Sequence, residues 1–444
     1  MKWSCPFGQF PFVVNGGTNM KWRFLLVFFI SLIGFSAQAH AESLQKQIDK
    51  TPSGGTLKLF DRVYREQATI RKPITIVGGE KTLLKAGYDK TVLTIENTKD
   101  VTLKNLNFSR SQSAIDVKKS SQIHIENLKM VYMFSGVNIR NSSDVHVKNF
   151  KMRGIDGQYA DKGTGIAAYD SKRINISDSD ITEVLDAYYL ERVTGSRIIN
   201  NIATFSRYGL HYMYGKDIYA TGNTLENNVT GIMLMIAKNA LLEKNKIQYQ
   251  SDWNSSGFTL YNAENIVTKN NELIGNRTAI SSQNMKKSTI LDNTFLTNQT
   301  AVEFTGSYKE NKVEHNDFLG NIVNIRSDGT ASNIVGNYYD DYSGFDVEDD
   351  GIGDSKYVAL QSFGQWMVRE PAYQYYIESP SVVLLNQMDQ QTNKTETSQL
   401  VDEKPRMKSI TEFETDRPMK IWLIVLGGIL FIGSLYGWRR SVRI

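Results

Sequence analysis

Apolar and polar residues alternate over many short stretches of the chain. Residues 123–125 and 145–147 each carry a histidine between two branched aliphatic residues, and Asn, Gly, Ser and Asp separate such stretches. Alternating runs of about three to five residues between turn formers are typical of β-strands. The pattern therefore predicts strands, with His124 and His146 on an outer face.

These strands belong to a repeat. Segments of the form N-x-x-Φ carry an apolar residue at a step of mostly 22 residues, and a second series of Ala and Gly keeps the same step. The first series is Phe108, Met130, Met152, Ile181, Ala203, Leu225, Ile247, Leu273, Phe295 and Phe318, and the second is Ala114, Gly136, Gly165, Ala187, Gly209, Gly231, Gly257, Ala279 and Ala301. Both series have longer steps in the same two places. Coils of about 22 residues predict an all-β, right-handed parallel β-helix whose like positions stack about 4.8 Å apart.

Both ends of such a solenoid expose strand edges and need caps. We expect an N-terminal cap over 42–59 that contains a short amphipathic helix, the β-helix over 60–360, and an aromatic-rich C-terminal cap over 361–385. Residues 386–420 are polar and rich in Gln, Thr, Lys and Glu, which predicts a linker.

The two termini carry targeting patterns. Residues 1–41, with Met20 as a possible true start, combine early cations, an apolar run and small residues, which predicts a secretory signal peptide. Residues 421–438 are uncharged and long enough for a transmembrane helix, and the arginines of 439–444 predict a cytoplasmic tail. The body is then expected on the extracytoplasmic face of the cytoplasmic membrane, anchored by its C-terminal helix.

Composition narrows the chemistry. Apolar residues make up 41% of the chain and charged residues 22%, so a large core is possible. A formal net charge of +4 excludes a nucleic-acid-binding polycation. The single cysteine, Cys5, lies in the predicted signal peptide, so neither disulfides nor a thiolate cluster is expected. A soft metal would have to be held by Met or His.

The motifs YGLHYMYG and TGIMLMIA lie one coil apart. His211 should therefore stack on Met233, and Met213 on Met235, at the corners of a rectangle about 5 Å by 7 Å. Thioether and imidazole donors without carboxylate or thiolate favour Cu(I). The alternative is that these methionines only fill a packing interface, since Met adapts to irregular surfaces.

A second candidate metal site is acidic. The run FDVEDDGIGD places Asp346, Glu348, Asp350 and Asp354 at alternate or nearly alternate positions around glycines. Alternating carboxylates suit Ca²⁺, although the run departs from the EF-hand pattern. A solvated acidic turn is the alternative.

An enzyme is the alternative for the chain as a whole. A polysaccharide lyase or epimerase on a β-helix scaffold would need clustered carboxylates on one face. Adjacent coils pair no carboxylates along the strand that follows the small residue, and the remaining candidates are Asp178, Asp180, Asp186 and Glu191.

Several motifs occur together in one order: YGLHYMYG, GIMLM, GNYYDDYSGFDVEDDGIGDSKY, ESPSVVLL and VDEKPRMK. In this combination the chain resembles the NosD family, extracytoplasmic accessory proteins of nitrous oxide reductase, over about residues 44–408. It departs from the family pattern at Tyr339, where Trp is expected, and at Ile236, where an aromatic residue is expected.

The resemblance implies a non-enzymatic, copper-linked maturation factor. Its expected partners are an ABC transporter (the NosY permease and NosF ATPase), apo nitrous oxide reductase and a copper donor protein, and its task is assembly of the copper–sulfide centre. Residues 386–420 would then dock on the transporter. The resemblance supplies the segment around His211, whereas the ligand set of transient Cu(I) rests on the predicted stacking.

Overall fold

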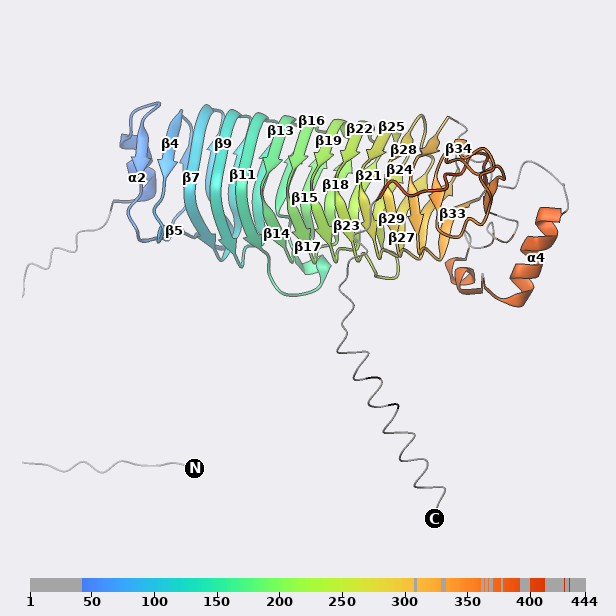
Figure 1. Ribbon diagram of the computed structural model, residues 1–444. Coiled ribbons are helices and arrows are strands. Elements are labelled where there is room, and N and C mark those ends of the chain that lie inside the picture. The colour runs from blue at the N-terminus through green and yellow to red at the C-terminus, as the bar shows by residue number, and fades with distance from the viewer. Residues whose placement is uncertain are drawn as a thin grey trace, which may run out of the picture. The chain divides into compact units, whose positions relative to one another are not determined.

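A computed structural model describes residues 42–306, 310–328, 333–360, 363, 366, 370–376, 378–391, 400–411, 427 and 431. The chain divides into two units, Met1–Ser43 and Leu44–Ile444. The second unit contains a parallel β-helix with few helices (Figure 1), so the predicted fold class is confirmed. Its first element is the helix α2 (Leu44–Lys50), which buries Leu44 and Ile48 against the first coil.

Two parallel sheets run along the solenoid. The 12-stranded sheet contains β3 (Ala68–Ile70), β6 (Gly87–Glu96), β8 (Ser111–Lys118), β10 (Ser135–Arg140), β12 (Ile166–Tyr169), β15 (Asp186–Glu191), β18 (Tyr208–Met213), β21 (Thr230–Met235), β24 (Ser256–Tyr261), β27 (Thr278–Gln283), β30 (Thr300–Thr305) and β33 (Val323–Ser327). This sheet carries the candidate site.

The 23-stranded sheet forms the rest of each coil. It contains β1 (Thr56–Lys58), β2 (Val63–Tyr64), β4 (Ile74–Val77), β5 (Leu83–Leu84), β7 (Lys99–Ser109), β9 (Ser121–Val131), β11 (Ser143–Arg153), β13 (Lys172–Ser177), β14 (Asp180–Thr182), β16 (Thr194–Ile199), β17 (Ile202–Thr204), β19 (Lys216–Thr221), β20 (Thr224–Glu226), β22 (Lys238–Glu243), β23 (Lys246–Gln248), β25 (Glu264–Lys269), β26 (Glu272–Ile274), β28 (Thr289–Leu291), β29 (Thr294–Leu296), β31 (Lys312–Glu314), β32 (Asp317–Leu319), β34 (Asn333–Val335) and β35 (Tyr338–Tyr339).

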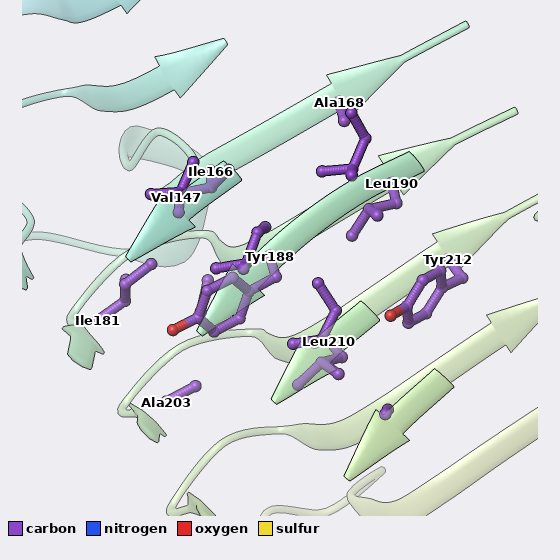
Figure 2. Close-up of a cluster of buried hydrophobic side chains, with 14 of the residues drawn as sticks. Val147, Ile166, Ala168, Ile181, Tyr188, Leu190, Ala203, Leu210 and Tyr212 are labelled. Carbon is purple, nitrogen blue, oxygen red and sulfur yellow. The ribbon is translucent and has the colours of Figure 1, made fainter. Parts of the chain in front are cut away.

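The core lies between the two sheets and repeats from coil to coil. Figure 2 shows Ile166, Tyr188 and Leu210 following one another along the solenoid, with Ala203 and other small and branched side chains facing them. The small-residue positions are needed because the chain is tightly packed there: a Cβ on Gly231 would lie 2.6 Å from the Gly257 carbonyl oxygen. Close packing between successive coils therefore explains why this series consists of Gly and Ala.

A ladder of buried asparagines links successive coils. Each side chain donates from Nδ2 to the Oδ1 of the next ladder residue, 2.8–3.2 Å away. The ladder runs through Asn201, Asn223, Asn245, Asn271, Asn293, Asn316 and Asn337. Each Oδ1 also accepts the backbone N–H of the preceding ladder residue, so the turn's polar groups are satisfied inside the solenoid.

The ladder ends on a distant residue. The strand β37 (Leu400–Asp402) pairs antiparallel with β36 (Tyr357–Leu360), and the Asp402 carboxylate accepts N–H groups from Gly336 and Asn337. Further along, Arg406 donates to the Gly336 carbonyl oxygen and to Asp317. These side chains occupy the hydrogen-bonding positions that a further coil would fill.

This contact corrects the predicted linker over 386–420. The short helix η2 (Pro371–Tyr376) is followed by α4 (Pro380–Gln391), which begins before the predicted linker and extends into it. Residues 400–411 form a strap on the last coils instead of a free tether, because Asp402, Arg406 and the Asp317-bound Thr411 replace the missing coil's hydrogen bonds. Polar composition alone could not distinguish the two cases.

The targeting predictions fall largely outside the described residues. The predicted signal peptide over 1–41 does so entirely, and so does the predicted transmembrane helix over 421–438 except for residues 427 and 431. Among the helices that the structure describes, none combines the length and apolar character needed to cross a bilayer.

Candidate metal site

The two motifs of the predicted soft-metal site lie on neighbouring strands. β18 and β21 are parallel neighbours, with His211 in register with Met233 and Met213 with Met235. Leu210, which alternates with them, is fully buried in the core. The four donors therefore share the outer face of the 12-stranded sheet, in the middle of the solenoid (Figure 1).

His211 is the best-defined donor. Its side chain is 7% exposed, and its ring lies edge-on between Tyr189 and Tyr208, with ring centroids 4.8 Å and 4.7 Å away. Its Nδ1 atom lies 2.8 Å from Asp186 Oδ2. Its Nε2 atom is buried and has no hydrogen-bond partner among the residues that the structure describes. A buried nitrogen with a free lone pair is costly unless a ligand occupies it.

Asp186 is held from two directions. Its side chain is 3% exposed, and the Arg207 guanidinium donates to both carboxylate oxygens at 3.0 Å and 2.9 Å. Burial alone would lower the pKa of Arg207, but the hydrogen bonds to Asp186 raise it. The buried negative charge is therefore paired, as burial of a carboxylate requires.

The three methionine residues are half-buried on the outer face of the sheet and do not lie in the core. Met213, Met233 and Met235 have intermediate exposure. The Tyr189 hydroxyl donates to Glu191 Oε2 at 2.8 Å and lies 3.3 Å from Met213 Sδ. Burial, with the hydrogen bond to Glu191, raises the pKa of Tyr189, so its single proton stays on the phenol. Because the carboxylate is the stronger acceptor, the Met213 sulfur keeps its lone pairs for another ligand.

This donor set fits a soft monovalent ion. One bare imidazole nitrogen and three half-exposed thioether side chains lie on two adjacent strands. The Asp186 carboxylate lies behind the histidine, and Glu191, in register with Met213, is occupied by Tyr189 and Arg192. In the part of the chain that is described, no group of three or more His, Cys, Asp or Glu side chains is placed to hold a metal. The arrangement thus favours Cu(I) over Zn²⁺ or Ca²⁺.

A groove of about 570 Å³ begins beside the site. Its lining includes Tyr208, Met233, Trp253, Arg277 and Glu303. Trp253 lies in the second and shorter of the two insertions in the 22-residue repeat, and the Arg277 guanidinium stacks on its ring at 4.6 Å. An ion or a partner chain could therefore approach Met233 from this side.

The acidic run forms a turn closed on its own backbone. Asp346 accepts the N–H groups of Asp350 and Gly351, and Asp354 accepts that of Val347. Asp350 accepts the N–H of Ile352, and Glu348 is exposed. Asp346, Asp350 and Asp354 thus serve as turn acceptors, and among the described residues no three carboxylates of this run are placed to hold one ion.

The carboxylates that a polysaccharide lyase or epimerase would need are also dispersed. Asp180 begins β14 of the 23-stranded sheet, and Asp178, directly after β13, pairs with Lys148. Asp186 and Glu191 lie at the two ends of β15, where each is bound by an arginine. The contact of Asp186 with His211 was not predicted from the sequence.

The second histidine pair lies elsewhere. His124 and His146 are in register on β9 and β11 of the other sheet, with ring centroids 5.0 Å apart and planes 8° from parallel. Burial, and then the nearby His124, lower the pKa of His146. Face-to-face rings do not aim their nitrogens at a common ion, so this pair adds nothing to the candidate site.

The fold and the site together define a parallel β-helix protein with a soft-donor patch on one outer wall. Comparison with known families gives a more specific result: residues 153–344 match the family model described as periplasmic copper-binding protein (NosD). The resemblance to the NosD family is thereby confirmed over the segment that contains His211, Met213, Met233 and Met235.

Two curated relatives carry the same family name. Both are called probable ABC transporter binding protein NosD: the protein of Pseudomonas aeruginosa is 30% identical over 98 residues, and that of Stutzerimonas stutzeri is 27% identical over 129 residues. The alignments cover 21% and 28% of this chain and span 23% and 30% of the relatives' own lengths.

Solved structures share the fold. A PL6 alginate lyase in complex with a trisaccharide aligns with a TM-score of 0.51 at 13% identity, over 67% of this chain and 81% of the lyase. An N-terminal fragment of bacteriophage Phi29 gene product 12 aligns with a TM-score of 0.53 at 10% identity, over 73% of this chain and 74% of the fragment. At such identities the likeness concerns the β-helix alone.

Proposed function

We propose that this chain is an extracytoplasmic copper-handling accessory protein that works beside an ABC transporter. The observation that carries the proposal is the buried His211 Nε2 atom, without a hydrogen-bond partner in the described part of the chain, next to three methionines in register on two coils. The NosD family match and the names of the two curated relatives support copper and a transporter, respectively.

The ion is transient cargo in this proposal. Cu(I) enters between His211 and Met233, is held by these two with Met213 and Met235, and leaves when a partner offers competing soft donors. Thioethers bind Cu(I) without releasing a proton, so transfer costs little. The finer role is maturation of nitrous oxide reductase, with apo-reductase as recipient and a copper donor protein as source. The protein itself catalyses no reaction.

A Cu(I) competition titration tests the proposal. The purified protein is compared with a variant in which His211, Met213, Met233 and Met235 are all replaced by Ala. A matched control replaces the outward quartet of the next two coils, Thr259, Tyr261, Ser281 and Gln283, which has the same register. We expect tight binding of one Cu(I) in the wild type and the control, and its loss in the first variant. Equal affinities in all three would overturn the proposed site.

A further inference from the structure

The carboxylate behind His211 departs from the repeat. The residues in register with Asp186 on the next five strands are Tyr208, Thr230, Ser256, Thr278 and Thr300, and Val323 follows on the last strand. The first five carry hydroxyl groups and none of the six is charged, so the fold does not require a carboxylate at this position. Asp186 is the charged exception in this series, and its carboxylate contacts His211.

The hydrogen-bond geometry defines where the imidazole proton lies. Both oxygens of Asp186 accept from the Arg207 guanidinium, and Oδ2 also lies 2.8 Å from His211 Nδ1. A carboxylate paired in this way acts as an acceptor, so Nδ1 carries the proton of that contact. In the neutral ring the lone pair is then on Nε2, the atom that has no partner among the described groups.

We propose that Asp186 is the positioning residue of this site: it holds His211 as the Nδ1–H tautomer and presents Nε2 as the donor atom. Histidine in water favours the opposite tautomer, with the proton on Nε2, which would block that nitrogen as a ligand. Arg207 acts one step further back, because it fixes both oxygens of Asp186 and pairs its buried charge. The consequence for Cu(I) affinity rests on the proposed function, whereas the tautomer does not.

The tautomer can be read without any metal. The chain contains five histidines, so nitrogen-15 NMR of histidine-labelled protein is tractable, and a His211→Gln variant assigns the His211 resonances. We expect His211 to be a single Nδ1–H tautomer in the wild type. Asp186→Ser installs a hydroxyl residue that occurs in register at position 256, and it should shift His211 towards the Nε2–H form.

Glu191→Gln is the matched control. It removes a carboxylate from the other end of the same strand without contacting His211, and it should leave the tautomer unchanged. A wild-type His211 protonated on Nε2 would overturn the proposal, and so would an unchanged tautomer in folded Asp186→Ser. If Asp186→Ser does not fold, the wild-type spectrum still tests the proposal, because it shows which ring nitrogen of His211 carries the proton.

The same variants separate this proposal from the proposed function. If the wild-type protein binds Cu(I), Asp186→Ser should weaken that binding by about 10- to 100-fold, which is the usual effect of removing a group that orients a metal ligand. An unchanged Cu(I) affinity would contradict a role of Asp186 in ion binding. A fixed Nδ1–H tautomer in a protein that binds no Cu(I) would sustain the positioning of His211 and overturn the copper function.

Discussion

At the scale of single residues, the candidate site contains side chains that differ in type from those at the equivalent positions of other coils. The residue after each strand from β6 to β30 of the 12-stranded sheet has a positive φ, and Asn262, Asn284 and Gly306 meet that requirement easily. Ile236 has the same conformation, with φ of 54°, and is 40% exposed. A β-branched residue is strained there and gains little burial, so its place beside Met235 points to surface function.

Replacing Ile236 by Asn should therefore stabilise the protein by about 1 kcal/mol, because the strain of a β-branched residue in the left-handed region is relieved. The free energy of unfolding from denaturant titration measures the effect. Ile236→Val keeps the β-branch and should give no gain. A destabilised Asn variant would show that Ile236 packs productively in the isolated protein.

An ion pair on the surface offers a pH-dependent prediction. The hydrogen bonds from Arg173 lower the pKa of Asp144 from 3.8 to about 2. Because the folded-state pKa is depressed, the pair's contribution is fully present above pH 3.8 and is lost as the pH falls through about 2. In Arg173→Ala, a carboxyl NMR titration should return Asp144 towards 3.8; a midpoint still near 2 would assign the shift to another cause.

At the scale of elements, the asparagine ladder holds the turns together. Asn271 Oδ1 accepts two N–H groups of Asn245, and Asn271 Nδ2 donates to the Leu242 carbonyl oxygen at 2.8 Å. Removing this side chain leaves two buried donors without their acceptor. Such a loss acts on both neighbouring coils, since each ladder residue serves the coil before it and the coil after it.

We expect Asn271→Ala to cost about 2–6 kcal/mol of unfolding free energy, at about 1–3 kcal/mol for each of the two buried donors left unsatisfied. Asn265→Gly is the control, because it removes an exposed amide contact while keeping a residue that tolerates positive φ. Its cost should stay below about 1 kcal/mol. Equal losses of unfolding free energy in both variants would mean that the buried asparagine ladder contributes no more to stability than the exposed amide contact of Asn265.

The same scale explains what could be predicted from the sequence. The 22-residue step predicted the register of His211 with Met233, because stacked coils repeat their hydrogen bonding. It did not predict the contact of Asp186 with His211. Strict alternation backward from Tyr189 places Asp186 inside, but Ala187 and Tyr188 are both buried, and this break turns Asp186 outward.

At the scale of the whole molecule, the solenoid is closed by a segment far away in the sequence. Asp402 satisfies the N–H groups of Gly336 and Asn337, and Asp317 accepts from Ser409, Ile410 and Thr411. Sequence composition could not predict this strap because it contains no periodic pattern. Its position follows from specific hydrogen bonds to the last coils.

Asp402→Ala should loosen that end without unfolding the centre. The amides of Gly336 and Asn337 should exchange with deuterium at least about tenfold faster, since tenfold corresponds to about 1.4 kcal/mol, within the range for losing a charged acceptor. Glu403→Ala, at an exposed neighbouring position, should leave exchange unchanged. Unchanged protection in Asp402→Ala would contradict the capping role.

The central claim is that soft donors from two successive coils meet on one ion. X-ray absorption at the copper edge of the Cu(I)-loaded protein tests it most directly, because sulfur and nitrogen neighbours give different scattering. We predict a first shell with one imidazole nitrogen and at least two thioether sulfurs, which loses its sulfur contribution when Met213, Met233 and Met235 are replaced by Ala. A shell of nitrogen and oxygen alone, or sulfur scattering that survives these substitutions, would contradict the account.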